Sequence, residues 1–172
     1  MKTQTQTKSK KPLIGLSTLI FHKNKGMFSE KTVEINSKDP DFKFRRKSLE
    51  AIKKELKGKN LSMHSLTKRV FTEKDKDLRK MEINILKSEI IACKFLGCKE
   101  LIVHLKQEKL NKNEVEIFKE LLSFSKKYKV EILYEPNGKF NGNFFIYNLK
   151  QFKNLKVNLD LGHLNTAVVN KT

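Results

Sequence analysis

Short apolar segments alternate along this chain with longer amphipathic ones, and this alternation limits the folds available to it. Several of the short segments are almost continuously apolar, which is typical of strands that are covered on both faces. Each is also too short for a helix of ordinary length. The predicted strands are residues 13–19, 32–35, 61–64, 100–104, 130–135 and 157–160.

The longer segments between these strands carry apolar residues near a 3.6-residue period, which predicts amphipathic helices. The predicted helices are residues 48–56, 76–96, 114–128 and 144–152. Thr72 and Asp75 are candidates to cap the start of the longest one, and Gly97 is expected to end it. Asn113, followed three residues later by Glu116, predicts a cap for the next helix.

Repeated strand–helix–strand units imply right-handed crossovers and therefore an α/β fold with a parallel sheet. Two architectures fit this order: an open doubly wound sheet, or part of a (β/α)₈ barrel. We expect residues 1–11 to form a disordered basic tail and residues 12–172 to form a single domain. A chain of 172 residues is long enough for one domain of ordinary size.

Four of the predicted strands end in a side chain that can bind a metal ion. His64, His104, Glu135 and Asp160 each close a short, mostly apolar strand, and His163 follows three residues after Asp160. In a parallel β/α fold these strand ends lie on one face, where barrels build their active sites. The pattern therefore predicts that these five side chains surround a divalent-metal site.

The residue types narrow the chemistry of this predicted site. Imidazole and carboxylate ligands together suit zinc, manganese or iron better than calcium. A metal held this way can lower the pKa of a bound water to about 7 and produce a hydroxide nucleophile. A single histidine after a strand is more often a hydrogen-bonded loop residue than a metal ligand. The prediction therefore depends on several metal-binding residue types that occur together at strand ends. His22, the remaining histidine, has no such placement and is interpreted as a surface residue.

The formal net charge of +18 at pH 7 would attract phosphates, nucleic acid or an anionic surface. All but four of the 37 basic residues are Lys, however, and such a bias also arises from codon usage or thermal adaptation. Arg45, Arg46, Lys68 and Arg69 are candidate phosphate contacts near early strand–helix loops, with a solvated basic surface as the alternative.

Two cysteines, Cys93 and Cys98, fit neither a zinc pair nor a disulfide framework, which favours buried thiols in a reducing compartment. No apolar segment reaches the roughly 18 residues of a membrane span. No cleavage site for a signal peptide follows the first apolar segment. The predicted location is the cytoplasm, without a membrane partner.

From about residue 60 to residue 167 the chain resembles the xylose isomerase-like TIM barrels. The resemblance rests on His64 in LSMHS, His104 in LIVH, Glu135 in LYEP and the LDLGH segment that ends at His163. The two early histidines are similar to those of the endonuclease IV branch, also called AP endonuclease family 2. That resemblance implies that His64, His104 and Glu135 hold a first zinc ion. It also implies that Glu135 and Asp160 share a second ion and that His163 belongs to a third.

Relative to that family, about six of eight strand–helix units are present, which predicts a C-terminally incomplete barrel. Completion by a partner chain or by self-association is expected, with a truncated product as the other alternative. The first functional hypothesis is metal-dependent phosphodiester hydrolysis of endonuclease IV type on damaged DNA. The second is isomerisation or epimerisation of a sugar or sugar phosphate, with Glu135 as base or metal ligand and manganese or magnesium as the ion. The third is an inactive partial barrel or a subunit that needs a partner.

Overall fold

The computed structural model describes residues 31–37, 43–67, 73–105, 109–136 and 142–160, together with the backbone of residues 16–17. Ten helices and strands follow one another in these ranges. The strands are β1 (Leu16–Ser17), β2 (Thr32–Asn36), β3 (Asn60–His64), β4 (Glu100–His104), β5 (Glu131–Glu135) and β6 (Lys156–Val157). The helices are α2 (Arg46–Glu55), α3 (Lys76–Leu96), α4 (Lys112–Lys127) and α5 (Gly142–Lys150).

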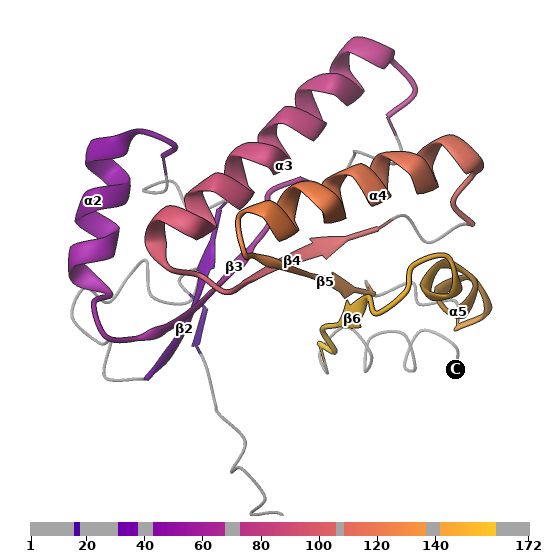
Figure 1. Ribbon diagram of the computed structural model, residues 1–172. Helices are drawn as coiled ribbons and strands as arrows, with labels where there is room; N and C mark the ends of the chain where they lie inside the picture. The colour runs from indigo at the N-terminus through magenta and orange to yellow at the C-terminus, as the bar shows by residue number, and fades with distance from the viewer. Residues whose placement is uncertain are drawn as a thin grey trace, which may run out of the picture.

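The six strands form one sheet in the order β1-β2-β3-β4-β5-β6, and every neighbouring pair is parallel. The strands therefore lie in the sheet in the same order as in the sequence, which is the arrangement of a (β/α) barrel. In a doubly wound sheet the strand order reverses partway across. The predicted parallel α/β fold is confirmed. Helices α2, α3 and α4 lie on the same side of the sheet (Figure 1).

Alternate residues of each strand face opposite ways, and this alternation separates the core from the site. Val33, Met63, Leu101 and Ile132 have the parity that packs into the core beneath the helices. The last residues of β3, β4 and β5 have the opposite parity, so they point away from that helix-covered core. The same face carries Ile102, which is buried but lies outside the core cluster.

The longest helix begins and ends where the sequence indicates. Asp75 caps α3 by accepting hydrogen bonds from the backbone N–H groups of Asp77 and Leu78, both at 2.9 Å. Gly97 ends it in the left-handed conformation with φ 88°, which a residue with a side chain adopts only at a cost. Thr72, the other predicted capping residue, lies outside the described residues.

The cap predicted for the next helix is wrong by two residues. Asn111, not Asn113, caps α4, and its side chain accepts from the backbone N–H of Glu114 at 3.0 Å. Glu114 accepts in return from the N–H of Asn111 at 2.7 Å, which completes a capping box. Glu116, the predicted partner of Asn113, instead pairs with Lys119 on the helix surface.

The ends of the sheet differ from the sequence-based expectation. The first strand is described only at Leu16–Ser17, and β6 ends at Val157 rather than at residue 160. Beyond β6 the N–H of Asn158 still donates to the carbonyl of Tyr134 at 2.9 Å, so the chain remains attached to β5. No helix among the described residues combines the length and apolar character of a membrane span. The cytoplasmic location stays a prediction.

Candidate metal centre

Three strands bring their last residues together at one end of the sheet: His64 from β3, His104 from β4 and Glu135 from β5. His104 on β4 is in direct register with Glu135 on β5. His64 on β3 is in register with Ile102, so it lies level with a position two residues before His104 on β4. All three side chains share the face that the helices do not cover. Of the five ligands predicted from the sequence, these three form a compact group in the part of the chain that the structure describes.

One oxygen of Glu135 lies between the two imidazoles. The Oε2 atom of Glu135 is 2.9 Å from Nε2 of His64 and 3.5 Å from Nε2 of His104. The two rings tilt against each other with their centroids 5.0 Å apart. His104 and Glu135 are buried, and the side chain of His64 is 13% exposed, so the group opens to solvent beside His64.

These separations suit a single divalent cation. One ligand atom from each residue can be chosen so that all three lie within 4.8 Å of one another. Ligands placed about 2.1 Å from a tetrahedral ion lie about 3.4 Å apart, which falls within this range. The donor set of two imidazoles and one carboxylate is that of zinc centres that keep a position open for water or substrate.

Backbone carbonyls orient both imidazoles. Nδ1 of His104 donates to the carbonyl of Glu135 at 3.1 Å, and Nδ1 of His64 faces the carbonyl of Ser65 at 3.3 Å. In both rings Nε2 is therefore the nitrogen directed at Glu135. Such a contact from the second ring nitrogen is the usual way in which a metal-binding histidine is held in one tautomer and orientation.

The carboxylate of Glu135 favours a positive charge at the position of His64. Burial by itself lowers the pKa of His64, but the hydrogen bond that His64 donates to Glu135, the negative charge of Glu135, and the smaller contributions of Glu34 and the Ser65 carbonyl outweigh it. The pKa of His64 therefore lies above its usual value of 6.5. A cation that replaces the Nε2 proton would meet the same attraction.

The other predicted ligands do not join this group in the described part of the chain. Asp160 lies three residues beyond β6, is partly exposed, and is not one of the three residues that converge. His163, Lys68 and Arg69 lie outside the described residues. The predicted roles of these four side chains stay predictions.

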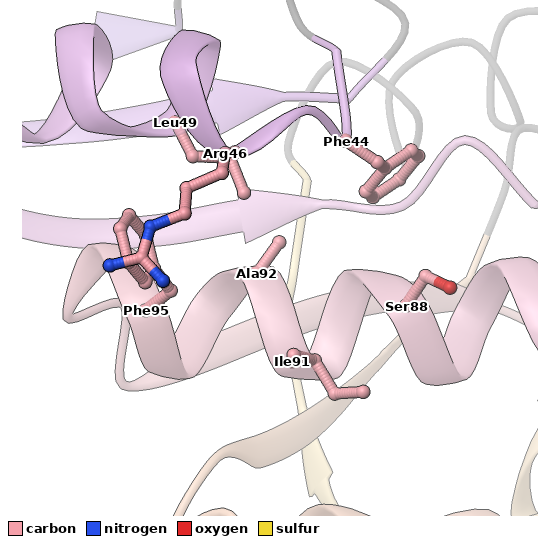
Figure 2. Close-up of a pocket in the computed structure, with 7 residues that line it drawn as sticks. All are labelled: Phe44, Arg46, Leu49, Ser88, Ile91, Ala92 and Phe95. Atoms are coloured by element: carbon pink, nitrogen blue, oxygen red, sulfur yellow. The ribbon is translucent and has the colours of Figure 1, made fainter.

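Arg45 and Arg46 lie at the start of α2 and are not among the three clustered residues. Arg46 pairs with Glu50 at 2.9 Å on the exposed surface of that helix. It also lines a groove of about 320 Å³ between α2 and α3, whose apolar walls come from residues such as Phe44, Ile91 and Phe95 (Figure 2). None of the three clustered residues lines this groove.

Glu89 is a fully buried carboxylate that was not predicted from the sequence as part of the site. Glu89 lies on the apolar face of α3, between Leu86 and Cys93, where both neighbours on the face are completely buried. A charged residue inside an apolar helical stripe was the available signal, because buried Glu is rare unless it has partners. Its partners follow β2 and β3 at the same end of the sheet as His64.

Together, a sheet whose parallel strands follow sequence order and a His–His–Glu group at the strand ends define a β/α-barrel protein with a candidate metal centre. The model of the xylose isomerase-like TIM barrel family matches residues 31–170. The chain belongs to that family. No curated protein matches the chain.

Solved structures with low sequence identity share the fold. A D-tagatose 3-epimerase-like protein superposes with a TM-score of 0.71 at 17% identity, over 89% of this chain and 66% of its own. A D-psicose 3-epimerase crystallised in the presence of D-fructose gives 0.61 at 17% identity, over 80% of this chain and 55% of its own. The IolI protein with a bound zinc atom gives 0.51 at 22% identity, over 63% and 42% respectively.

The chain thus spans between about two fifths and two thirds of the length of these structures. Identities in this range establish the fold and leave the activity open. These structures are epimerases or epimerase-like proteins and IolI, so the predicted resemblance to the endonuclease IV branch specifically is not supported.

Proposed function

We propose that His64, His104 and Glu135 bind one divalent metal ion and that this centre serves isomerisation or epimerisation of a small polyhydroxy carbonyl compound. The observation that carries the proposal is the convergence of two imidazoles and one carboxylate within 4.8 Å at the carboxyl ends of adjacent parallel strands. The structure of IolI, which shares the fold and has a bound zinc atom, supports the proposal of a metal ion in this chain. Zinc and manganese both suit this donor set.

The choice of reaction rests on chemistry and on the named relatives. Two of the structural relatives carry epimerase names, which favours a sugar-like substrate over a phosphodiester. A bound divalent ion would polarise the carbonyl and hydroxyl oxygens of such a substrate. Glu135 is then either a ligand or the base that removes a proton from the carbon next to the carbonyl. Its position between the histidines favours the ligand role.

Phosphodiester hydrolysis is the second candidate, because the net charge of +18 would attract a nucleic acid. A zinc ion held by His64, His104 and Glu135 would lower the pKa of water and so supply a nucleophile for that reaction. The two candidates predict different substrates for the same centre, so a single metal-loaded preparation can be tested on both.

The first experiment measures metal binding by the full chain. Titration with zinc or cobalt should give about one ion per chain. The double variant His64→Ala, His104→Ala should weaken binding by on the order of 100-fold or more, because loss of a residue that only hydrogen-bonds to a metal ligand already costs about 10–100-fold in affinity. His22→Ala is the matched control, because it removes one histidine that the sequence places away from the strand ends. Unchanged metal content in the double variant would remove the ligand assignment.

The second experiment measures chemistry on the metal-loaded chain. Incubation with D-fructose, D-tagatose or D-psicose in deuterated water should place deuterium on the carbon next to the carbonyl, as detected by NMR. A duplex with one abasic site should remain uncut in the same preparation. Nicking of the duplex without deuterium exchange would instead establish the hydrolase. Glu135→Gln separates the two roles of this residue, since loss of metal marks a ligand and loss of exchange with metal retained marks a base.

A further inference from the structure

Four hydrogen-bond donors converge on the carboxylate of Glu89 in α3. The Oγ atoms of Ser37 and Ser65 lie 2.6 and 2.5 Å from it, and the backbone N–H of Leu66 donates at 2.7 Å. The hydroxyl of Thr67 adds a fourth contact at 3.2 Å. All four partners are neutral donors, and Glu89 itself is completely buried.

These donors occupy the two loops that leave the sheet beside the metal centre. Ser37 is the first residue after β2, and Ser65, Leu66 and Thr67 are the first three after β3. Glu89 therefore ties the carboxyl ends of two neighbouring strands to the helix that covers them. All four described donors lie at the carboxyl end of the sheet.

Ser37 and Ser65, which bind Glu89, also make the contacts that hold His64 in place. The N–H of Ser37 donates to the carbonyl of His64 at 3.1 Å, and the N–H of Ser65 donates to the carbonyl of Ile102 at 2.9 Å. The carbonyl of Ser65 faces Nδ1 of the His64 ring. Any displacement of Ser37 or Ser65 would thus move the backbone and the ring of His64.

Fold stability alone does not call for a carboxylate at this position. A buried charge is costly even when it is hydrogen-bonded, and an apolar side chain of similar volume is often as stable or more so. The neighbours Leu86, Ile90 and Cys93 on the same helix face show that an apolar residue would suit the surroundings. A polar cluster with every member satisfied does, however, specify one conformation of the loops it joins.

We propose that Glu89 is a positioning residue of the metal centre, which fixes the loops after β2 and β3 so that His64 presents Nε2 to the bound ion. This inference rests on the proposed function, because it assumes that His64 is a ligand. Glu89 is not one of the three proposed ligands and acts through Ser37 and Ser65.

The test compares cobalt binding by the full-length wild type and by Glu89→Gln. The amide keeps one acceptor oxygen and replaces the other with an NH₂ group, so one of the two pairs of donors that share the Glu89 oxygens loses its acceptor. We expect the cobalt dissociation constant to rise by about 10–100-fold, as for other residues that orient metal ligands. The visible cobalt spectrum, which reports coordination geometry, should change as well. Ser65→Ala is the second variant, because it removes one link without altering charge, and a smaller shift in the same direction is expected.

Glu114→Gln is the matched control for loss of stability. Glu114 is also a buried carboxylate on a helix, but it accepts from the N–H of Asn111 in its own capping box. This variant should lower the urea midpoint while it binds cobalt with the affinity and spectrum of the wild type. Wild-type affinity and spectrum in Glu89→Gln, or in Ser65→Ala should Glu89→Gln not fold, would overturn the inference. An equal loss in Glu114→Gln would overturn it too.

Hydrogen exchange of the metal-free chain separates this inference from the proposed function. A wild type that binds no cobalt refutes the metal centre, but the amides of Ser37 and Ser65 still report the order of the two loops. Neither amide donates to Glu89, and both should exchange at least about tenfold faster in Glu89→Gln. Unchanged exchange at both amides would show that Glu89 does not position these loops.

Discussion

At the scale of single residues, the chain concentrates its buried polar groups near the strand ends. His104, Glu135, Glu89 and Asn148 are all buried, and each has hydrogen-bonding partners from another element. Asn148 of α5, for example, accepts from the N–H of Leu110 at 3.0 Å, in the segment that precedes α4. Buried polar groups with satisfied partners fix the relative position of the elements they connect.

Tyr134 provides a prediction about pH at this scale. Burial raises the pKa of Tyr134 to about 12, although the hydrogen bond from Asn148 lowers it in part. The unfolded phenol titrates near pH 10, so between about pH 10 and 12 the unfolded chain releases a proton that the folded chain keeps. The protonated Tyr134 therefore stabilises the folded state fully below about pH 10. This contribution to the free energy of unfolding, about 2–3 kcal/mol, is lost as the pH rises through 12.

Urea unfolding at about pH 9, 10 and 11 can check this effect of Tyr134. The free energy of unfolding of the wild type should decline over that range, and Tyr134→Phe should decline less. Parallel declines of the two proteins would show that other groups, such as lysines, cause the loss. Tyr147→Phe serves as the control, since Tyr147 is 37% exposed.

At the scale of helices and strands, periodicity predicts which elements exist, and local hydrogen bonds decide where they begin. The order of four helices and six strands is confirmed, and β4 is confirmed to the residue. The start of α4 was predicted two residues too late, because both Asn111 and Asn113 stand three residues before a Glu. Only Glu114 turns toward the core, at 6% exposure, and this burial selects Asn111 as the cap.

Two alanine substitutions test this assignment of the α4 cap. Asn111→Ala should lower the free energy of unfolding by about 0.5–2 kcal/mol, because it removes a capping acceptor. Asn113→Ala changes an exposed position inside the first turn, where Ala is the better helix former, so stability should stay the same or rise slightly. Thermal unfolding monitored by circular dichroism measures both. Equal losses in the two variants would contradict the cap.

At the scale of the whole molecule, the net charge and the candidate metal centre are separate properties. The chain carries a formal net charge of +18, whereas the centre itself is built from two histidines and a carboxylate. A field of this size attracts nucleic acid without reading its sequence or its damage. Affinity for DNA is therefore not evidence that DNA is the substrate.

Salt dependence distinguishes attraction by charge from recognition of damage. We expect duplexes with and without an abasic site to bind equally, and binding to fall by roughly 10³–10⁵ between about 50 and 200 mM salt if 6–10 phosphates are contacted. Removal of metal with a chelator should leave this binding unchanged. Fluorescence anisotropy with labelled duplexes measures all three effects. A metal-dependent preference for the abasic duplex would instead favour the hydrolase.

The sequence by itself determined the class of fold, the order of the elements and the three central residues of the candidate site. It could do so because strand ends are readable as local patterns, and parallel strands collect their ends on one side of a sheet. His64, His104 and Glu135 were thus predictable without coordinates.

Only the tertiary structure decided how those residues meet. The two-residue offset between β3 and β4, the choice of Nε2 as the inward nitrogen, and the support that Glu89 gives to the loops all depend on contacts between residues distant in sequence. Such contacts follow from packing a helix against a sheet, and no local pattern encodes the partners that a buried carboxylate will find.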